Sequence, residues 1–161
     1  MNIFVTDISP VVSAQNLCNV HVNKMLLESV QLLSTFLWSH GHNVPYKPTH
    51  INHPCVKWLI NDTNGSHLNW LNQHALALTQ EYNYRYNKPH KSSDVLHYIQ
   101  NDIMKYIFTN QTPDDFAMCM PDFCKTNTAI MSYRNYYRYK RYNMKIMMSW
   151  TNRLPPEWLF I

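Results

Sequence analysis

Hydrophobic positions recur with a helical period along most of the chain. Between residues 13 and 38 they fill most of the helix circumference, and only five polar side chains share a narrow arc: His21, Lys24, Glu28, Gln31 and Thr35. These five residues, which we call the polar stripe, lie within roughly 80° of one another on an α-helix. A surface helix has the opposite proportions, with a stripe of apolar residues on a polar cylinder. The pattern therefore predicts a buried helix with one polar stripe.

Similar periodicity predicts further helices, separated by loops that contain proline or glycine. Pro10 is expected in the first turn of a helix that Asp7 or Ser9 caps. The expected helices are residues 13–38, 55–61, 67–86, 95–108 and 126–144, with loops at 40–52 and 109–122 and an irregular aromatic tail at 150–161. The chain is thus predicted to be all-α, a single domain over residues 1–161 with about five helices around the buried N-terminal helix.

The composition excludes several classes of protein. Two glycines in 161 residues argue against a glycine-rich phosphate loop, a Rossmann turn or a hairpin-rich β architecture. No apolar run approaches the roughly 20 residues of a membrane span, and no basic segment precedes an apolar one at the start. The four cysteines lack a Cys-x-x-Cys spacing, which is typical of reduced thiols. We expect a soluble, cytoplasmic protein with no membrane partner and no cofactor.

The polar stripe is the first candidate site. Polar groups in a buried helix are costly unless each has a partner or faces water. One interpretation is structural, with Lys24 and Glu28 forming an ion pair one turn apart. The other is catalytic, because a carboxylate beside an ammonium group and an imidazole has the composition of an acid–base site. Four different functional groups in line favour the catalytic interpretation, with His21, Lys24 and Glu28 as catalytic residues and Gln31 as a substrate contact.

A second candidate site is the loop that carries His50 and His53, just before Pro54. A His-x-x-His spacing can chelate a metal, but a zinc site needs three or four ligands, and His21 or Glu28 would have to complete the set. Two other roles remain open, namely contacts to a substrate phosphate or base, and hydrogen bonds that hold the loop. We assign His50, His53 and the following Trp58 to substrate binding and assign no metal ligand.

A third candidate site is the helix expected at residues 126–144, where basic residues alternate with aromatic rings and no acidic residue occurs. Arginine forks bind phosphates, and aromatic rings stack on bases. A solvated basic face with tyrosines that span core and water is the alternative, and the net charge of +4 favours neither strongly. The residues assigned here to substrate binding are Tyr133, Arg134, Tyr137 and Lys140.

The polar stripe also carries a resemblance to a known family. The spacing His21-x6-Glu28 on an early helix, followed by a loop with histidines and the helix at 67–86, resembles the pyrimidine-dimer DNA glycosylases of the phage endonuclease V type. The runs His-Val-x-Lys-Met-x-x-Glu and Asn-His-Pro-Cys are similar to those of other phage-encoded proteins. The resemblance covers roughly residues 1–90 and implies a small all-α DNA-binding enzyme. It also implies that Glu28 is the essential carboxylate and that His21 accompanies it.

The chain departs from the family pattern at the nucleophile. The family attacks the sugar C1′ with the free α-amine of a small residue that is exposed when the initiator methionine is removed. Here the bulk of Asn2 predicts that Met1 is retained, which would leave the amine one residue too far out. Leu27 and Gln31 also stand where the family has basic residues. Lys24 is then the alternative amine, but a buried Lys24 paired with Glu28 is expected to stay charged, so we predict hydrolysis by water without a Schiff base.

Three functions follow as hypotheses. The first is an enzyme that cleaves an N-glycosidic bond in DNA or a nucleotide, where Glu28 stabilises an oxocarbenium-like sugar or activates water. In duplex DNA such an enzyme must flip the target base out of the stack. The second is a metal-dependent hydrolase or nuclease built on His50 and His53. The third is a non-catalytic viral accessory protein that binds nucleic acid or protein.

Overall fold

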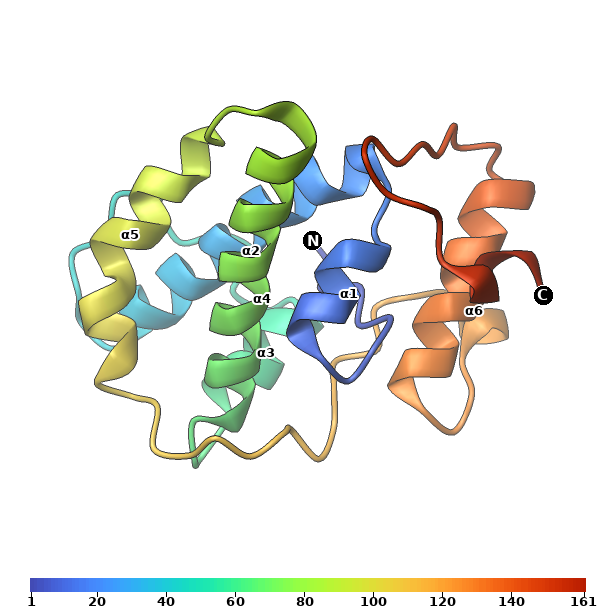
Figure 1. Cartoon of the computed structure of the whole chain (residues 1–161). Helices are drawn as coiled ribbons and strands as arrows, with labels where there is room; N and C mark the ends of the chain where they lie inside the picture. The colour runs from blue at the N-terminus through green and yellow to red at the C-terminus, as the bar shows by residue number, and fades with distance from the viewer.

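The computed structural model describes every residue from Met1 to Ile161, and all of its regular elements are helical. The predicted all-α class is therefore confirmed, with six α-helices rather than about five (Figure 1). The elements in chain order are α1 (Pro10–Asn16), α2 (Asn19–Ser39), α3 (Pro54–Ile60), α4 (Ser66–Tyr86), α5 (Lys91–Met104), the 3₁₀ turn η1 (Asp122–Cys124), α6 (Ala129–Tyr142) and the 3₁₀ turn η2 (Glu157–Phe160).

The continuous helix expected from residue 13 to residue 38 is wrong at one point, because the chain breaks between α1 and α2. Leu17 and Cys18 are extended, with ψ of 142° and 164°. The backbone N–H of Cys18 donates instead to the Tyr137 hydroxyl, 2.8 Å away on α6. The break therefore depends on a tertiary hydrogen bond. Ser9 caps α1 and Pro10 occupies its first turn, as predicted.

The later helix boundaries agree with the prediction to within a few residues, and the largest shift is at α5. That helix begins four residues before the predicted start because His90, rather than the serines that follow it, is the cap. The His90 ring accepts a hydrogen bond from the backbone N–H of Ser92 at 3.0 Å. Helix α6 begins after the Thr128 cap. None of these helices combines the length and the apolar character that crossing a membrane requires.

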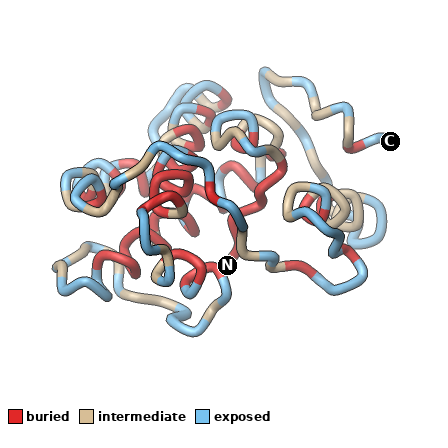
Figure 2. Tube along the Cα trace, turned by 90° about the horizontal axis from the view of Figure 1, so that it is seen from below, coloured by how far each residue is buried: buried red, intermediate tan, exposed pale blue.

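The core forms where α2 crosses α4, with α1, α3 and α5 around them (Figure 1). Figure 2 shows that the buried residues gather in this part of the molecule. The central turns of α2 supply side chains with almost no exposure, including Met25, Leu26 and Leu33. Burying a side chain of this size contributes about 1.5–3 kcal/mol each. Helix α2 is thus held in place on most of its circumference, as its sequence pattern predicts.

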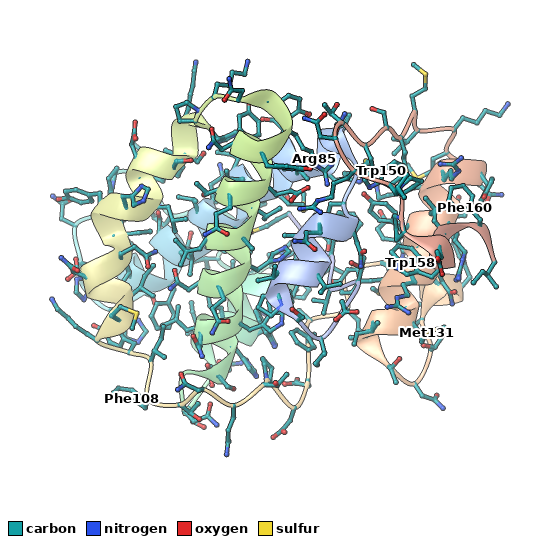
Figure 3. All side chains as sticks on the ribbon, viewed as in Figure 1. Arg85, Phe108, Met131, Trp150, Trp158 and Phe160 are labelled. Carbon is teal, nitrogen blue, oxygen red and sulfur yellow. The ribbon has the colours of Figure 1, made fainter.

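Helix α6 lies at one edge of the molecule, and the C-terminal tail returns along it (Figure 1). Trp150 and Trp158 of the tail lie on the side of α6 that faces the other helices, whereas Phe160 is 54% exposed beside α6 (Figure 3). The Trp150 indole donates to the carbonyl of Asn16 at 3.0 Å, and Arg138 donates to the carbonyl of Trp158. Hydrogen bonds of the tail therefore connect α6 to α1.

Candidate active site

The chain begins with a non-helical N-terminal segment, residues 1–9. Its first two residues lie against the carboxylate of Glu28, in the middle of α2. The backbone N–H of Asn2 donates to Glu28 Oε2 at 2.8 Å, and the amino nitrogen of Met1 lies 3.9 Å from the same oxygen. The Lys24 ammonium, one turn earlier on α2, lies 3.6 Å from Oε1. Glu28 is only 8% exposed. One buried carboxylate therefore faces two amino groups and one amide donor.

The Asn2 side chain fixes this arrangement. Its Oδ1 accepts the backbone N–H groups of Ile3 and Phe4, at 2.8 and 3.2 Å, and its Nδ2 donates to the Cys119 carbonyl at 2.8 Å. Phe4 adopts a left-handed backbone conformation with φ of 42°, and Ser13 donates to its carbonyl. A non-glycine residue in this region is strained, and surrounding contacts must hold it. The N-terminal segment is thus tied down along its length.

A pocket of about 510 Å³ opens above Glu28. This volume falls within the usual range for small-ligand sites. Helix α2 forms its floor, the start of α3 and the loop before η1 form its walls, and α6 closes it. The polar groups that line it are Met1, Asn2, His21, Lys24, Glu28, His53, Cys119, Tyr136 and Lys140.

The charge of this pocket favours an anionic ligand. Glu28 supplies the only carboxylate among the lining residues, against the cations of Lys24, Lys140 and the Met1 amino group. The Lys140 ammonium lies 4.7 Å from the centre of the Tyr136 ring, so a cation–π contact holds it over the pocket. Cationic lining raises the local concentration of anions such as DNA phosphates.

His21 is held as a neutral ring. The Tyr137 hydroxyl accepts the N–H of Cys18 and lies 2.7 Å from His21 Nδ1, which the Cys18 sulfur also approaches at 3.3 Å. Burial, together with the charges of Lys140 and Lys24, lowers the pKa of His21 to about 4. When the hydroxyl is the donor to Nδ1, the neutral ring carries its proton on Nε2. His21 is suited to donate a hydrogen bond, whereas the protonated imidazolium needed to transfer a proton to a leaving base is absent.

His53 reaches the pocket from the cap of α3. Its Nδ1 accepts the backbone N–H of Cys55 at 3.1 Å, and burial is the main cause that lowers its pKa. The Cys55 and Cys119 sulfurs lie 3.2 Å apart beside it, and the hydrogen bond to Cys119 and burial raise the pKa of Cys55. His53, Cys55 and Cys119 therefore form a cluster of possible metal ligands. The set considered from sequence also needed His50, whose ring centre lies 6.5 Å from that of His53 and which does not line the pocket.

The structure gathers five of the sequence-predicted site residues and leaves six outside the pocket. The five that line it are His21, Lys24, Glu28, His53 and Lys140, and the six that do not are Gln31, His50, Trp58, Tyr133, Arg134 and Tyr137. Trp58 is a core residue that stacks on His67 at 4.5 Å and donates to the Asp115 carbonyl. Tyr133 and Tyr137 are fully buried on the inner face of α6. These aromatic rings hold the pocket walls instead of facing a substrate in the pocket.

The phosphate contact of Arg134 stays a prediction, and part of its guanidinium group already has partners in the structure. Its Nε donates to the Thr6 carbonyl at 2.9 Å, and it lies 3.5 Å from the Asp7 carboxylate. It also lies over the Trp158 ring. Arg134 therefore ties α6 to the N-terminal segment, and Lys140 is the cation that α6 offers to the pocket.

The structure bears on two expectations about the amines. The expectation that Lys24 is buried is wrong, because its side chain is 63% exposed at the pocket rim, on a side of α2 that no other helix covers. The Met1 amine was expected to lie one residue too far out for attack, and this stays a prediction. In the structure this amine lies 3.9 Å from Glu28 Oε2, because the first residues fold inward beneath the loop that carries Cys119. The apolar residues at the start of the chain indicate that this segment is buried. Nothing in the sequence shows which carboxylate its amino group contacts.

The fold and the site define a small all-helical protein with a cationic pocket around one carboxylate, and the comparison with known families is more specific. The family model described as pyrimidine dimer DNA glycosylase matches residues 1–94, which is more than half of the chain. The chain therefore belongs to the pyrimidine dimer DNA glycosylase family. No curated protein and no solved structure gives a significant match. The matched region contains His21, Lys24, Glu28 and His53, whereas Cys119 and Lys140 lie beyond it.

Proposed function

We propose that this protein is a DNA glycosylase that cleaves the N-glycosidic bond of a damaged pyrimidine in DNA, with Glu28 as the key carboxylate. The observation that carries the proposal is the pocket in which buried Glu28 faces an amino group. The family match supports the class of reaction, and its description makes a pyrimidine dimer the first substrate to test.

Glu28 is suited to stabilise the transition state. Departure of the base leaves positive charge on the sugar ring, and a fixed carboxylate in a partly buried site stabilises that charge more strongly than water does. The amide of Asn2 donates to one carboxylate oxygen, and the ammonium of Lys24 lies 3.6 Å from the other. These contacts fix the orientation of the carboxylate.

The geometry supports the Met1 α-amine as nucleophile over the amine of Lys24. The Met1 amine lies inside the pocket, whereas Lys24 stands exposed at its rim. As a class, α-amines lose a proton more readily than lysine side chains do. Attack by the amine nitrogen on C1′ forms a C–N bond as the glycosidic bond breaks, and the base leaves with one proton. Ring opening then moves the second amine proton to the ring oxygen and gives an imine.

The remaining lining residues serve binding. The Nε2–H of His21 is a hydrogen-bond donor for the base or sugar, and Lys140 is a cation for the phosphate beside the damaged nucleotide. A pocket of about 510 Å³ beside a buried carboxylate requires the nucleotide to leave the duplex.

The test is reductive trapping on a duplex that contains one cyclobutane pyrimidine dimer, with an undamaged duplex as control. With borohydride present, we expect a covalent complex that forms only on the damaged duplex and whose linked peptide begins at the first residue of the purified chain. A linked peptide that contains Lys24 would reassign the nucleophile, and cleavage of the glycosidic bond without any adduct would assign the attack to water. Because the cyclobutane ring keeps the cleaved pyrimidine attached to its neighbour, cleavage is measured at the sugar, as an abasic site. Failure to cleave a glycosidic bond in any damaged duplex would contradict the proposed function.

A further inference from the structure

A second hollow, of about 740 Å³, lies on the other side of Lys24. We call it the flanking groove; α2 lines it with Val20, Asn23, Lys24 and Leu27, and the turn between α4 and α5 lines it with residues 88–92. We propose that the flanking groove binds the DNA strand beside the nucleotide processed at Glu28, with Lys88 and Lys91 on its phosphates. This inference rests on the proposed function and adds the path of the strand.

Continuity with the pocket is the first argument. Lys24 lines both the Glu28 pocket and the flanking groove, so the two hollows meet at this one side chain. The Lys24 ammonium is exposed between them. A strand that places one nucleotide above Glu28 has an adjacent phosphate at this rim and can continue into the groove.

Charge is the second argument. Lys24, Lys88 and Lys91 line the flanking groove, and no carboxylate does. Lys88 and Lys91 are exposed, and neither takes part in an ion pair. Unpaired lysines along a groove suit a polyanion, because each phosphate contact releases a condensed counterion. The exposed Lys105, by contrast, is held by the carboxylate of Asp102.

The groove is built on a fixed turn. The His90 ring accepts the N–H of Ser92 through Nδ1 and therefore donates through Nε2 to the Asn23 side chain on α2, at 3.0 Å. The Tyr46 and Ser92 hydroxyls lie 3.0 Å apart across the same turn. Both nitrogens of His90 are thus occupied, so His90 positions the turn while the two lysines remain free to bind.

The floor suits the rings of nucleotides. Val20 and Leu27 expose 54% and 37% of their surface on α2, and the half-buried Tyr82 ring lies beside them. Exposed apolar side chains on an otherwise buried helix point to a binding surface. An apolar floor with a rim of lysines matches the chemistry of a nucleotide, whose sugar and base are flat or apolar and whose phosphate is anionic.

The test measures binding of duplex DNA as a function of salt for the double variant Lys88→Ala/Lys91→Ala. Loss of two phosphate contacts should lower the slope of log K against log salt by about two units, and weaken binding about tenfold or more at low salt. The single variants Lys88→Ala and Lys91→Ala should each lose about one unit. Lys105→Ala is the control for these single variants, because it removes one charge just after the other end of α5, outside the groove. Its slope should equal that of the wild type.

The outcomes separate this inference from the proposed function. If the double variant has the same salt slope as the wild type, and the wild type is active, the proposed role of the flanking groove is overturned. The glycosylase proposal would then still stand. An equal loss of slope in Lys105→Ala would also overturn it, because the effect would then be one of net charge. Absence of base release by the wild type would contradict the proposed function, while the salt slopes would still report whether DNA lies in the groove.

Discussion

Two helices of this protein carry a histidine followed seven residues later by a glutamate. Helix α2 has His21 and Glu28, helix α4 has His74 and Glu81, and both helices are 21 residues long. All four side chains are buried. Each glutamate also has a cation one helical turn away, Lys24 or Arg85. The two pairs are equivalent in sequence spacing and differ in what surrounds them.

We call the α4 pair, His74 and Glu81, closed, because other side chains of the fold occupy both carboxylate oxygens. Glu81 accepts from Arg85 Nε at 2.7 Å and from Arg153 at 2.6 and 2.8 Å, so both of its oxygens are bonded to guanidinium groups. Arg85 points from α4 toward the junction of α1 and α2 (Figure 3), where it also donates to the Leu17 carbonyl. His74 donates to the Pro10 carbonyl and stacks on a tryptophan. The contacts to Leu17, Arg153 and Pro10 join α4 to other parts of the fold.

The α2 pair is open. Glu28 has one short hydrogen bond, from Asn2, and its two amino neighbours lie at 3.6 and 3.9 Å. His21, like His74, is bonded through one nitrogen only, but His21 and Glu28 both line the pocket. The comparison teaches that burial of a glutamate does not by itself mark a catalytic site. The informative feature is a carboxylate that the fold leaves partly unpaired beside a cavity.

The largest expected effect on the free energy of unfolding is at Glu81, the glutamate of the closed pair. Glu81→Gln should lower the free energy of unfolding by about 3–5 kcal/mol, because it leaves the fully buried Arg85 charge without its partner. Denaturant unfolding at pH 7 measures this change. A loss below about 1 kcal/mol would show that Glu81 is not the structural member of the comparison.

Acid should destabilise the fold through the two histidines. Burial lowers the pKa of His21 and of His74 to about 4, from an unfolded value of about 6.5. The stability that each buried neutral histidine contributes is thus complete above about pH 6.5 and is lost as the pH falls toward 4. At pH 5 the free energy of unfolding should have fallen by about 2 kcal/mol per histidine. His74→Gln should flatten the dependence of unfolding free energy on pH in this window. An unchanged slope would mean that His74 is not buried as a neutral ring.

An intermediate effect is expected at the hydroxyl that orients His21. Tyr137→Phe removes the partner of the Cys18 N–H and of His21 Nδ1, so it should cost about 1–3 kcal/mol of stability. It should also lower the rate of base release, because the His21 ring loses its fixed orientation. Unfolding and single-turnover measurements on the same variant check both effects. Wild-type activity would show that the His21 orientation does not matter for the reaction.

The smallest effect on stability is expected at Lys140, which lines the α2 site and has no counterpart near His74. Lys140→Ala should change the free energy of unfolding by less than about 1 kcal/mol, because it removes a cation–π contact at a partly exposed site. We expect weaker binding of damaged DNA, by about tenfold. Arg134→Ala is the contrasting variant, because its loss should mainly destabilise the fold. Equal DNA affinities for Lys140→Ala and wild type would remove Lys140 from the site.

Much of the fold follows from local patterns in the sequence. The apolar circumference of α2 and the stripe of α4 predict both helices almost to their ends, since burial of these faces decides where they lie. The break at Cys18 was not predictable, because the Tyr137 hydroxyl that takes its N–H is 119 residues away. The His90 cap of α5 was missed because serine and aspartate are the usual caps.

The candidate site was predictable only in part. The spacing of His21 and Glu28 led to the pocket floor, but the same spacing at His74 and Glu81 marks a structural cluster. What distinguishes them is the N-terminal segment, whose amide reaches Glu28 across 26 residues. Long-range contacts of this kind leave no periodic pattern in the sequence.

The central claim is that the open glutamate performs the chemistry and the closed one holds the fold. The direct test compares Glu28→Gln with Glu81→Gln in single-turnover base release from damaged DNA, each below its own unfolding midpoint. Glu28→Gln should lose at least about a hundredfold in rate, as expected for removal of an electrostatic catalyst, with a melting temperature within a few degrees of wild type. Glu81→Gln should keep its rate while folded. A wild-type rate in folded Glu28→Gln would contradict the account.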